Sequence, residues 1–129
     1  MNILASCIRG NRFRKDCCLV LCNNCIIVEH DGCIANSGCD LIAYDNHRFF
    51  LIEIKSGNIS SSDADKIVQQ IKDCEYYYSQ YIMHRKKIRL FLWCRDRRKR
   101  LDDQARVKLT NNRIRVEYCQ GSFDLSNLD

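Results

Sequence analysis

The stretch SGCDLIAYDNHRFFLIEIKSG, residues 37–57, decides the fold of this 129-residue chain. Its two runs of branched and aromatic residues, 40–44 and 49–55, are typical of β-strands. Residues 45–47, Asp-Asn-His, carry a turn signal between them. We therefore predict a β-hairpin. Because its second strand is apolar on both faces, we expect that strand in the middle of a sheet covered on both sides.

Glu53 and Lys55 interrupt the apolar pattern of the second strand. Since side chains alternate between the two faces of a strand, these charges lie side by side on one face. Burying them is costly unless they are paired or bind an ion. The start of the first strand meets the end of the second in a hairpin, so Asp40 is expected beside Glu53. Two converging carboxylates suit Mg²⁺ or Mn²⁺, which prefer oxygen ligands. Such an ion polarises a phosphoryl oxygen, and Lys55 can stabilise the developing charge.

The pattern formed by Asp40, twelve further residues and then Glu53-Ile54-Lys55 resembles the signature of the PD-(D/E)XK nuclease superfamily. The resemblance covers roughly residues 25–94 and implies a mixed sheet flanked by helices. It implies that Asp40 and Glu53 bind the catalytic metal, with the backbone carbonyl of Ile54 completing the coordination. Lys55 would be the catalytic lysine. The implied activity is Mg²⁺-dependent (or Mn²⁺-dependent) hydrolysis of phosphodiester bonds in nucleic acid, with DNA as the expected substrate.

Further expectations come from subgroups of that superfamily. Nucleases similar to RecB carry a glutamine on the following helix that supports the site, and Gln70, or its neighbour Gln69, matches it. Many members carry an additional acid nearer the N-terminus, for which Glu29 is the nearest candidate. The other interpretation of Glu29 is a surface glutamate at a strand end. The length and the Ser-Gly-x-Asp context also look like archaeal Holliday junction resolvases, which implies a possible homodimer.

The remaining segments predict the elements around this hairpin. The order strand, strand, strand, helix, strand, helix, strand indicates one α/β domain over residues 1–129, with a mixed central sheet of about four to five strands flanked by helices, as in restriction endonucleases. We expect a short helix or frayed arm at the N-terminus and a loose tail from Gly121. The other predicted elements are strands at 17–22 (or a helix end there), 25–29, 87–94 and 113–118, a helix at 62–82, and a helix or long turn at 97–108.

Basic residues gather between positions 85 and 100, where nine Lys or Arg residues stand against a single acid, Asp96. The net charge of the whole chain is +5. Such a cluster suits a polyanion, although a solvated basic face without a partner is the alternative. The predicted nucleic-acid-binding residues are Arg85, Lys86, Lys87, Arg95, Arg97 and Arg98.

Ten cysteines are unusually many for a chain of this length. Cys22 and Cys25 form one Cys-x-x-Cys pair, but a zinc site would need a second pair at matching spacing. Three interpretations stay open: a metal–thiolate or iron–sulfur site, disulfides of the kind found in intracellular hyperthermophile proteins, and buried thiols that act as small apolar residues.

No apolar run approaches the roughly 20 residues that a membrane helix needs, and the first ten residues lack the charged region of a secretory signal. We therefore expect a cytoplasmic protein without a membrane partner. A metal-dependent nuclease is the leading hypothesis. The alternatives are a non-catalytic nucleic-acid-binding module on the same fold and a cysteine-based metal or redox protein.

Overall fold

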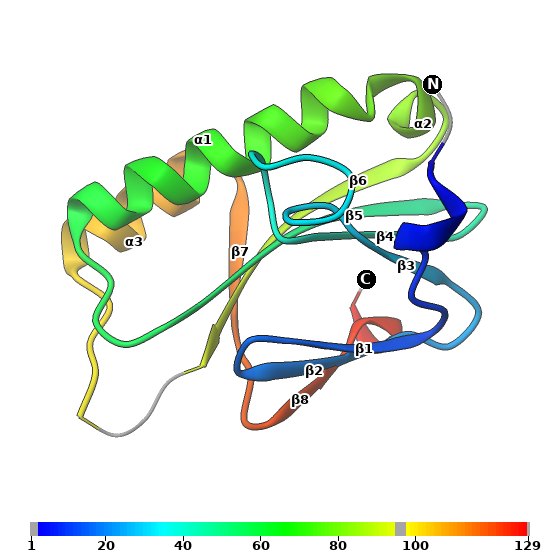
Figure 1. The fold of residues 1–129 in the computed structure, drawn as a ribbon. Coiled ribbons are helices and arrows are strands. Elements are labelled where there is room, and N and C mark those ends of the chain that lie inside the picture. Colours follow the sequence, from blue (N-terminus) through cyan, green and yellow to red (C-terminus); the bar gives the residue numbers. More distant parts are fainter. Residues whose placement is uncertain (1–2, 95–97, 129) are drawn as a thin grey trace.

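The computed structural model describes residues 3–94 and 98–128 and contains two β-sheets and three α-helices (Figure 1). In the main sheet, neighbouring strands are antiparallel from β3 to β5 and parallel from β5 to β7. The predicted α/β class and mixed central sheet are therefore confirmed. The five strands, in spatial order, are β3 (Ile26–Glu29), β4 (Leu41–Tyr44), β5 (Arg48–Ser56), β6 (Lys86–Cys94) and β7 (Ile114–Tyr118).

Two longer helices lie together on one face of this sheet, α1 (Ser61–Tyr77) and α3 (Asp103–Asn111) (Figure 1). Helix α1 begins where the Ser60 and Asp63 side chains cap each other's backbone N–H groups. Its buried residues recur every three or four positions and pack on the sheet. The predicted 62–82 helix is interrupted after Tyr77, and a short helix, α2 (Ser79–Ile82), follows.

A second, three-stranded sheet covers the opposite face of the main sheet (Figure 1). It consists of β1 (Arg12–Lys15), β2 (Cys18–Leu21) and β8 (Ser122–Asp124), with β1 and β2 joined as a hairpin. The expectation of a frayed N-terminal arm was wrong for β1, and that of a loose tail was wrong for β8. The tail is fixed because Leu125 and Leu128 are buried beneath the main sheet.

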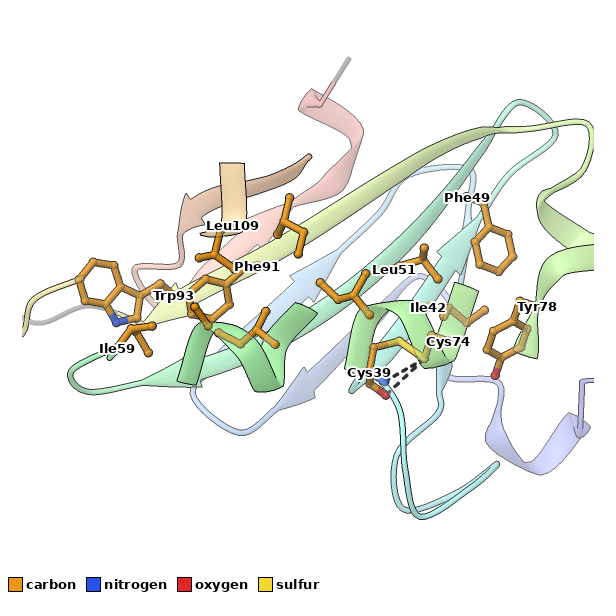
Figure 2. Packing of buried hydrophobic residues seen from close by; sticks show 14 of the residues in the cluster. Cys39, Ile42, Phe49, Leu51, Ile59, Cys74, Tyr78, Phe91, Trp93 and Leu109 are labelled. Atoms are coloured by element: carbon orange, nitrogen blue, oxygen red, sulfur yellow. Dashed lines mark hydrogen bonds between the residues drawn. A yellow bond between two sulfur atoms is a disulfide. The ribbon is translucent and has the colours of Figure 1, made fainter. Parts of the chain in front are cut away.

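Strand β5 lies at the centre of the molecule and is apolar on both faces, as predicted. Phe49 and Leu51 pack under α1, together with Phe91 and Trp93 of β6 (Figure 2). Phe50, Ile52 and Ile54 pack against the small sheet on the other face. Each face of β5 thus has its own apolar layer, and at the strand's carboxyl end only the last two residues, Lys55 and Ser56, extend beyond these layers.

All ten cysteines pair as disulfides, which confirms the cysteine-rich, disulfide-bonded interpretation. In the region that the structure describes, no thiol is left for a metal–thiolate site. None of the helices over residues 3–94 and 98–128 is long and apolar enough to cross a bilayer. The pairs are Cys7–Cys33, Cys17–Cys94, Cys18–Cys119, Cys22–Cys25 and Cys39–Cys74.

Candidate functional site

Asp40 and Glu53 meet at the carboxyl end of β5, where the hairpin prediction placed them. Leu41 pairs with Ile52 across the β4–β5 ladder, so the next residues outward are Asp40 and Glu53. The Asp40 N–H donates to Glu53 Oε1 at 3.1 Å, and the Ile54 N–H donates to Asp40 Oδ2 at 2.8 Å. These backbone bonds fix both carboxyl groups and leave one oxygen of each, Asp40 Oδ1 and Glu53 Oε2, without a backbone donor.

Two further predicted residues reach the same point. Lys55 Nζ lies 3.8 Å from Glu53 Oε2, and its side chain is 32% exposed. With its amide oriented to satisfy the hydrogen bonds, Gln70 of α1 donates from its side-chain nitrogen to Glu53 Oε2 and, at 3.3 Å, to the Lys66 carbonyl oxygen. Gln69 instead donates to Asp73 on the surface. Gln70 is therefore the glutamine that the fold brings to the acids.

The two acids create a strongly perturbed electrostatic environment. Asp40 is only 9% exposed and Glu53 only 2%. Burial, reinforced by the charge of Asp40, raises the pKa of Glu53 to about 9, although Lys55 opposes the shift. Burial also raises the pKa of Asp40 against the hydrogen bond from Ile54. Near neutral pH the free pair therefore retains a proton, and a bound cation would replace it by neutralising both carboxylates.

A disulfide joins the segment that carries Asp40, directly before β4, to the helix that carries Gln70. Cys39 precedes Asp40, and its partner Cys74 lies one helical turn after Gln70. The Cys39 N–H also donates to Cys74 Sγ at 2.9 Å (Figure 2). The cross-link thus sets the distance between two site residues. The sequence showed only a cysteine beside Asp40, because pairing among ten cysteines cannot be deduced from spacing.

Buried polar contacts hold the loop that leads into Asp40. His30 Nε2 lies 2.8 Å from the Ser37 carbonyl oxygen, so Nε2 carries the proton, while the Tyr78 hydroxyl donates to Nδ1 at 2.7 Å. Burial lowers the pKa of His30, which keeps the ring neutral. Gly38 has a φ of +99°, and a Cβ there would lie 2.8 Å from His30 Nε2. Only glycine fits this position.

A groove of about 470 Å³ opens at the end of β5, where Ile54 and Lys55 line it; the buried Asp40 and Glu53 lie next to these two residues but are not part of its lining. One wall is the start of α1, and the other is the β1–β2 turn, which contributes Asp16 and Cys17. The Trp93 indole N–H donates to the Gly57 carbonyl oxygen at 2.8 Å and fixes the chain just after Lys55. Sequence reasoning missed the turn because nothing in residues 12–21 indicates proximity to Lys55. The full lining is Asp16, Cys17, Ile54, Lys55, Ser56, Asn58, Ile59 and Asp63.

Glu29 does not join the two carboxylates. It pairs with Leu41, whose side chain packs with the core layer facing the small sheet, so Glu29 lies on the face opposite Asp40. There it accepts from Arg9 and Lys15, each at 2.8 Å. These bonds, led by that from Lys15, lower the pKa of Glu29 despite partial burial. Within residues 3–94 and 98–128, no three His, Cys, Asp or Glu side chains gather as a metal-binding group.

Strand β6 separates the two halves of the basic run. Lys86 pairs with Arg48 at the beginning of β5, whereas Trp93 pairs with Lys55 at the carboxyl end. Arg85, Lys86 and Lys87 therefore lie at the end of the sheet remote from the acids. Arg85 donates to backbone carbonyl oxygens, and Lys87 pairs with an acid of α1. Arg98 is exposed and follows the carboxyl end of β6, while the predictions for Arg95 and Arg97 fall outside the described residues.

The functional inference depends on the sequence pattern of residues 40–55 and on this geometry. The chain matches no model of a known protein family, no curated protein and no solved structure.

Proposed function

We propose that the chain is a Mg²⁺- or Mn²⁺-dependent phosphodiesterase that cuts DNA, with a site of the PD-(D/E)XK type. The supporting observation is the convergence of Asp40, Glu53, Lys55 and Gln70 from two strands and a helix. The residue types and spacing were selected from the sequence as catalytic, and folding brings them together beside an open groove. Burying two facing acids is costly for stability, so a purely structural core would not be expected to contain them.

The donor set fits a hard divalent cation. Asp40 and Glu53 would hold it, with the Ile54 carbonyl as the proposed backbone ligand and water filling the other positions, as Mg²⁺ sites commonly do. The bound ion would polarise the phosphoryl oxygen and activate a water molecule. Burial raises the pKa values of both acids in the free protein, and the charge of Asp40 adds to the shift at Glu53. A bound cation would stabilise the ionised form of both carboxylates.

The protein's own groups then have distinct tasks. Lys55 is partly exposed at the groove, where its ammonium group can orient the attacking water and stabilise charge on the phosphate. Gln70 fixes Glu53 through Oε2, and the Ile54 N–H fixes Asp40 through Oδ2. Because both acids are held by hydrogen bonds before substrate arrives, little reorganisation is required during the reaction.

The wider fold is compatible with this assignment. Antiparallel β3, β4 and β5 are followed by α1 and by a parallel β6, which is compatible with the mixed sheet that the superfamily resemblance implies. The α-helices of the described residues cover only one face of that sheet, and the small sheet covers the other. Homodimerisation and an intracellular location stay predictions. Disulfides persist in oxidising compartments and in the cytosol of some hyperthermophiles. The five disulfides therefore agree with a cytoplasmic location only if the protein comes from such an organism.

The direct test is cleavage by the purified, oxidised protein of duplex, single-stranded and branched DNA with Mg²⁺ or Mn²⁺. We expect cleavage of at least one substrate and a loss of about 100-fold or more in Asp40→Asn and Lys55→Ala. Asp73→Asn, which removes an exposed carboxylate of α1, is the matched control and should cleave like the parent. A parent that leaves all three substrates intact contradicts the proposal, and binding without cleavage favours the non-catalytic module.

A further inference from the structure

We propose that the β1–β2 hairpin is a nucleic-acid-binding arm whose Arg12 and Arg14 contact the phosphate backbone of the substrate next to the groove. The inference rests on the proposed function and adds a contact surface for that substrate. It concerns a part of the chain that lies outside the region resembling the nuclease superfamily. The predicted basic run does not include either arginine.

The hairpin is firmly attached to the catalytic end of the main sheet. Cys17, in the turn, is bonded to Cys94 at the end of β6, and Cys18 is bonded to Cys119 just after β7. Two adjacent residues of the turn region are thus cross-linked to the carboxyl ends of neighbouring strands. Asp16 and Cys17 consequently form a wall of the groove that Lys55 also lines. A ligand in the groove would therefore lie beside this turn.

Alternation along β1 separates its anchoring residues from its exposed ones. Phe13 packs against the core between the sheets, and Lys15 bonds to Glu29 and to the Asp31 carbonyl oxygen. Arg12 and Arg14 point the other way and are exposed. Within the described part of the chain, no hydrogen bond or ion pair is found for either guanidinium. Their fixed backbone and available donors suit an anionic partner.

Position and charge favour nucleic acid as that partner. Arg14 is two residues from the groove-lining Asp16, a distance of about 7 Å along a strand, and Arg12 is about 7 Å further. The two arginines therefore form a short track leading away from Lys55. The groove itself carries Asp16 and Asp63 besides Lys55, so a polyanion needs cations beyond the groove to be held. Guanidinium groups bind phosphates by paired hydrogen bonds.

The test measures binding of a fluorescein-labelled 20-base-pair DNA duplex in EDTA over a series of salt concentrations. In Arg12→Gln/Arg14→Gln we expect the affinity near 0.1 M salt to fall about ten-fold or more. The slope of log K against log salt should become shallower by about 1.8, because each lost phosphate contact contributes about 0.9. Both arginines are exposed, so circular dichroism should show an unchanged fold.

The matched control is Lys72→Gln/Arg113→Gln, which removes the same charge from exposed residues lining a hollow at the opposite end of the molecule. Its affinity should change by less than about three-fold. The proposed role of the hairpin is contradicted if the hairpin variant keeps the parent's salt slope, or if the control loses as much DNA affinity as the hairpin variant. Neither result contradicts the proposed nuclease activity. If the parent binds no nucleic acid and cleaves none, the proposed function and the arm both fail.

Discussion

The two ends of the main sheet each hold a partly or fully buried glutamate, but the neighbours of the two glutamates carry opposite charges. At the far end, Glu75 of α1 accepts from Arg89 at 2.8 Å and from Lys87 at 3.0 Å. Partial burial opposes ionisation there, but these two cations lower the pKa of Glu75. At the carboxyl end, Glu53 faces Asp40, and burial raises its pKa to about 9. An acid matched with cations is ionised in the fold, whereas the two facing acids retain a proton that the proposed cation would replace.

The largest expected difference between the two ends is in activity. Glu53→Gln should lower DNA cleavage by about 100-fold or more, because one carboxylate can no longer hold the cation. Glu75→Gln, the same substitution at the far end, should stay within about three-fold of the parent. The measurement is the initial rate of cleavage under saturating Mg²⁺ or Mn²⁺. Equal cleavage rates for the two variants would contradict the assignment of the active site to the carboxyl end of β5.

A measurement of metal affinity distinguishes the two ends of the sheet even if no cleavage is detected. Titration calorimetry with Mn²⁺ should show binding to the parent and to Glu75→Gln, and a loss of about ten-fold or more in affinity for Asp40→Asn. Binding should release protons and strengthen as the pH rises, since the raised pKa values mean that protons compete with the cation. Unchanged Mn²⁺ affinity in Asp40→Asn would place the ion elsewhere.

The disulfide beside the site should have a large effect on stability. Replacing both Cys39 and Cys74 with alanine should lower the free energy of unfolding by about 2–4 kcal/mol and slow cleavage, because Asp40 and Gln70 lose their common anchor. Urea denaturation of the oxidised proteins gives the first quantity. The Cys22→Ala/Cys25→Ala variant is the control, since its disulfide closes a short loop remote from α1. It should cleave DNA like the parent.

Stability should depend on pH with opposite signs at the two ends. Glu53 has a raised pKa, so its stabilising effect in metal-free protein is complete below about pH 4.5 and is lost as the pH rises toward 9. Over that range the free energy of unfolding should fall by about 1 kcal/mol per pH unit. Metal-free Glu53→Gln should lack this decline. If the free energy of unfolding of the metal-free parent does not change from pH 5 to 9, the raised pKa of Glu53 beside Asp40 is contradicted.

The far end should show the smallest effect, and in the acid range. Because the pKa of Glu75 is lowered, its contribution is present above its unfolded value and is lost as the pH falls through the folded value. Glu75→Gln should cost about 1 kcal/mol or less at pH 7. It should cost nothing measurable once the carboxyl is protonated at low pH. Thermal unfolding of both proteins across pH 3–7 tests this difference.

Local pattern was enough to predict the central elements of the fold. Period-two alternation and the turn at 45–47 specified the β4–β5 hairpin, which in turn placed Asp40 opposite Glu53. The serine-capped apolar stripe specified α1, and the resemblance to RecB-like nucleases singled out Gln70, which the structure places beside Glu53. These predictions succeeded because each depends on residues close in sequence or on a single strand pairing.

Other features of the molecule depend on contacts between distant segments. The basic run between 85 and 100 contains the predicted strand at 87–94, and this strand separates residues 85–87 from residues 98–100 by the length of the sheet. Of the two interpretations of Glu29, an additional acid of the site or a glutamate at a strand end, the register of β3 favours the second because it turns Glu29 to the other face. The small sheet was not predicted, because β8 is short and its pairing with β2 spans most of the chain.

The amino-acid sequence by itself determined which residues form the candidate site, since charges set into an apolar hairpin reveal their positions through a strict two-residue period. Only the tertiary structure decided how that site is enclosed. The pairing of ten cysteines, the second sheet, and the hairpin turn beside Lys55 all join residues far apart in the chain. Such contacts arise from the packing of complete elements and leave no local pattern in the sequence.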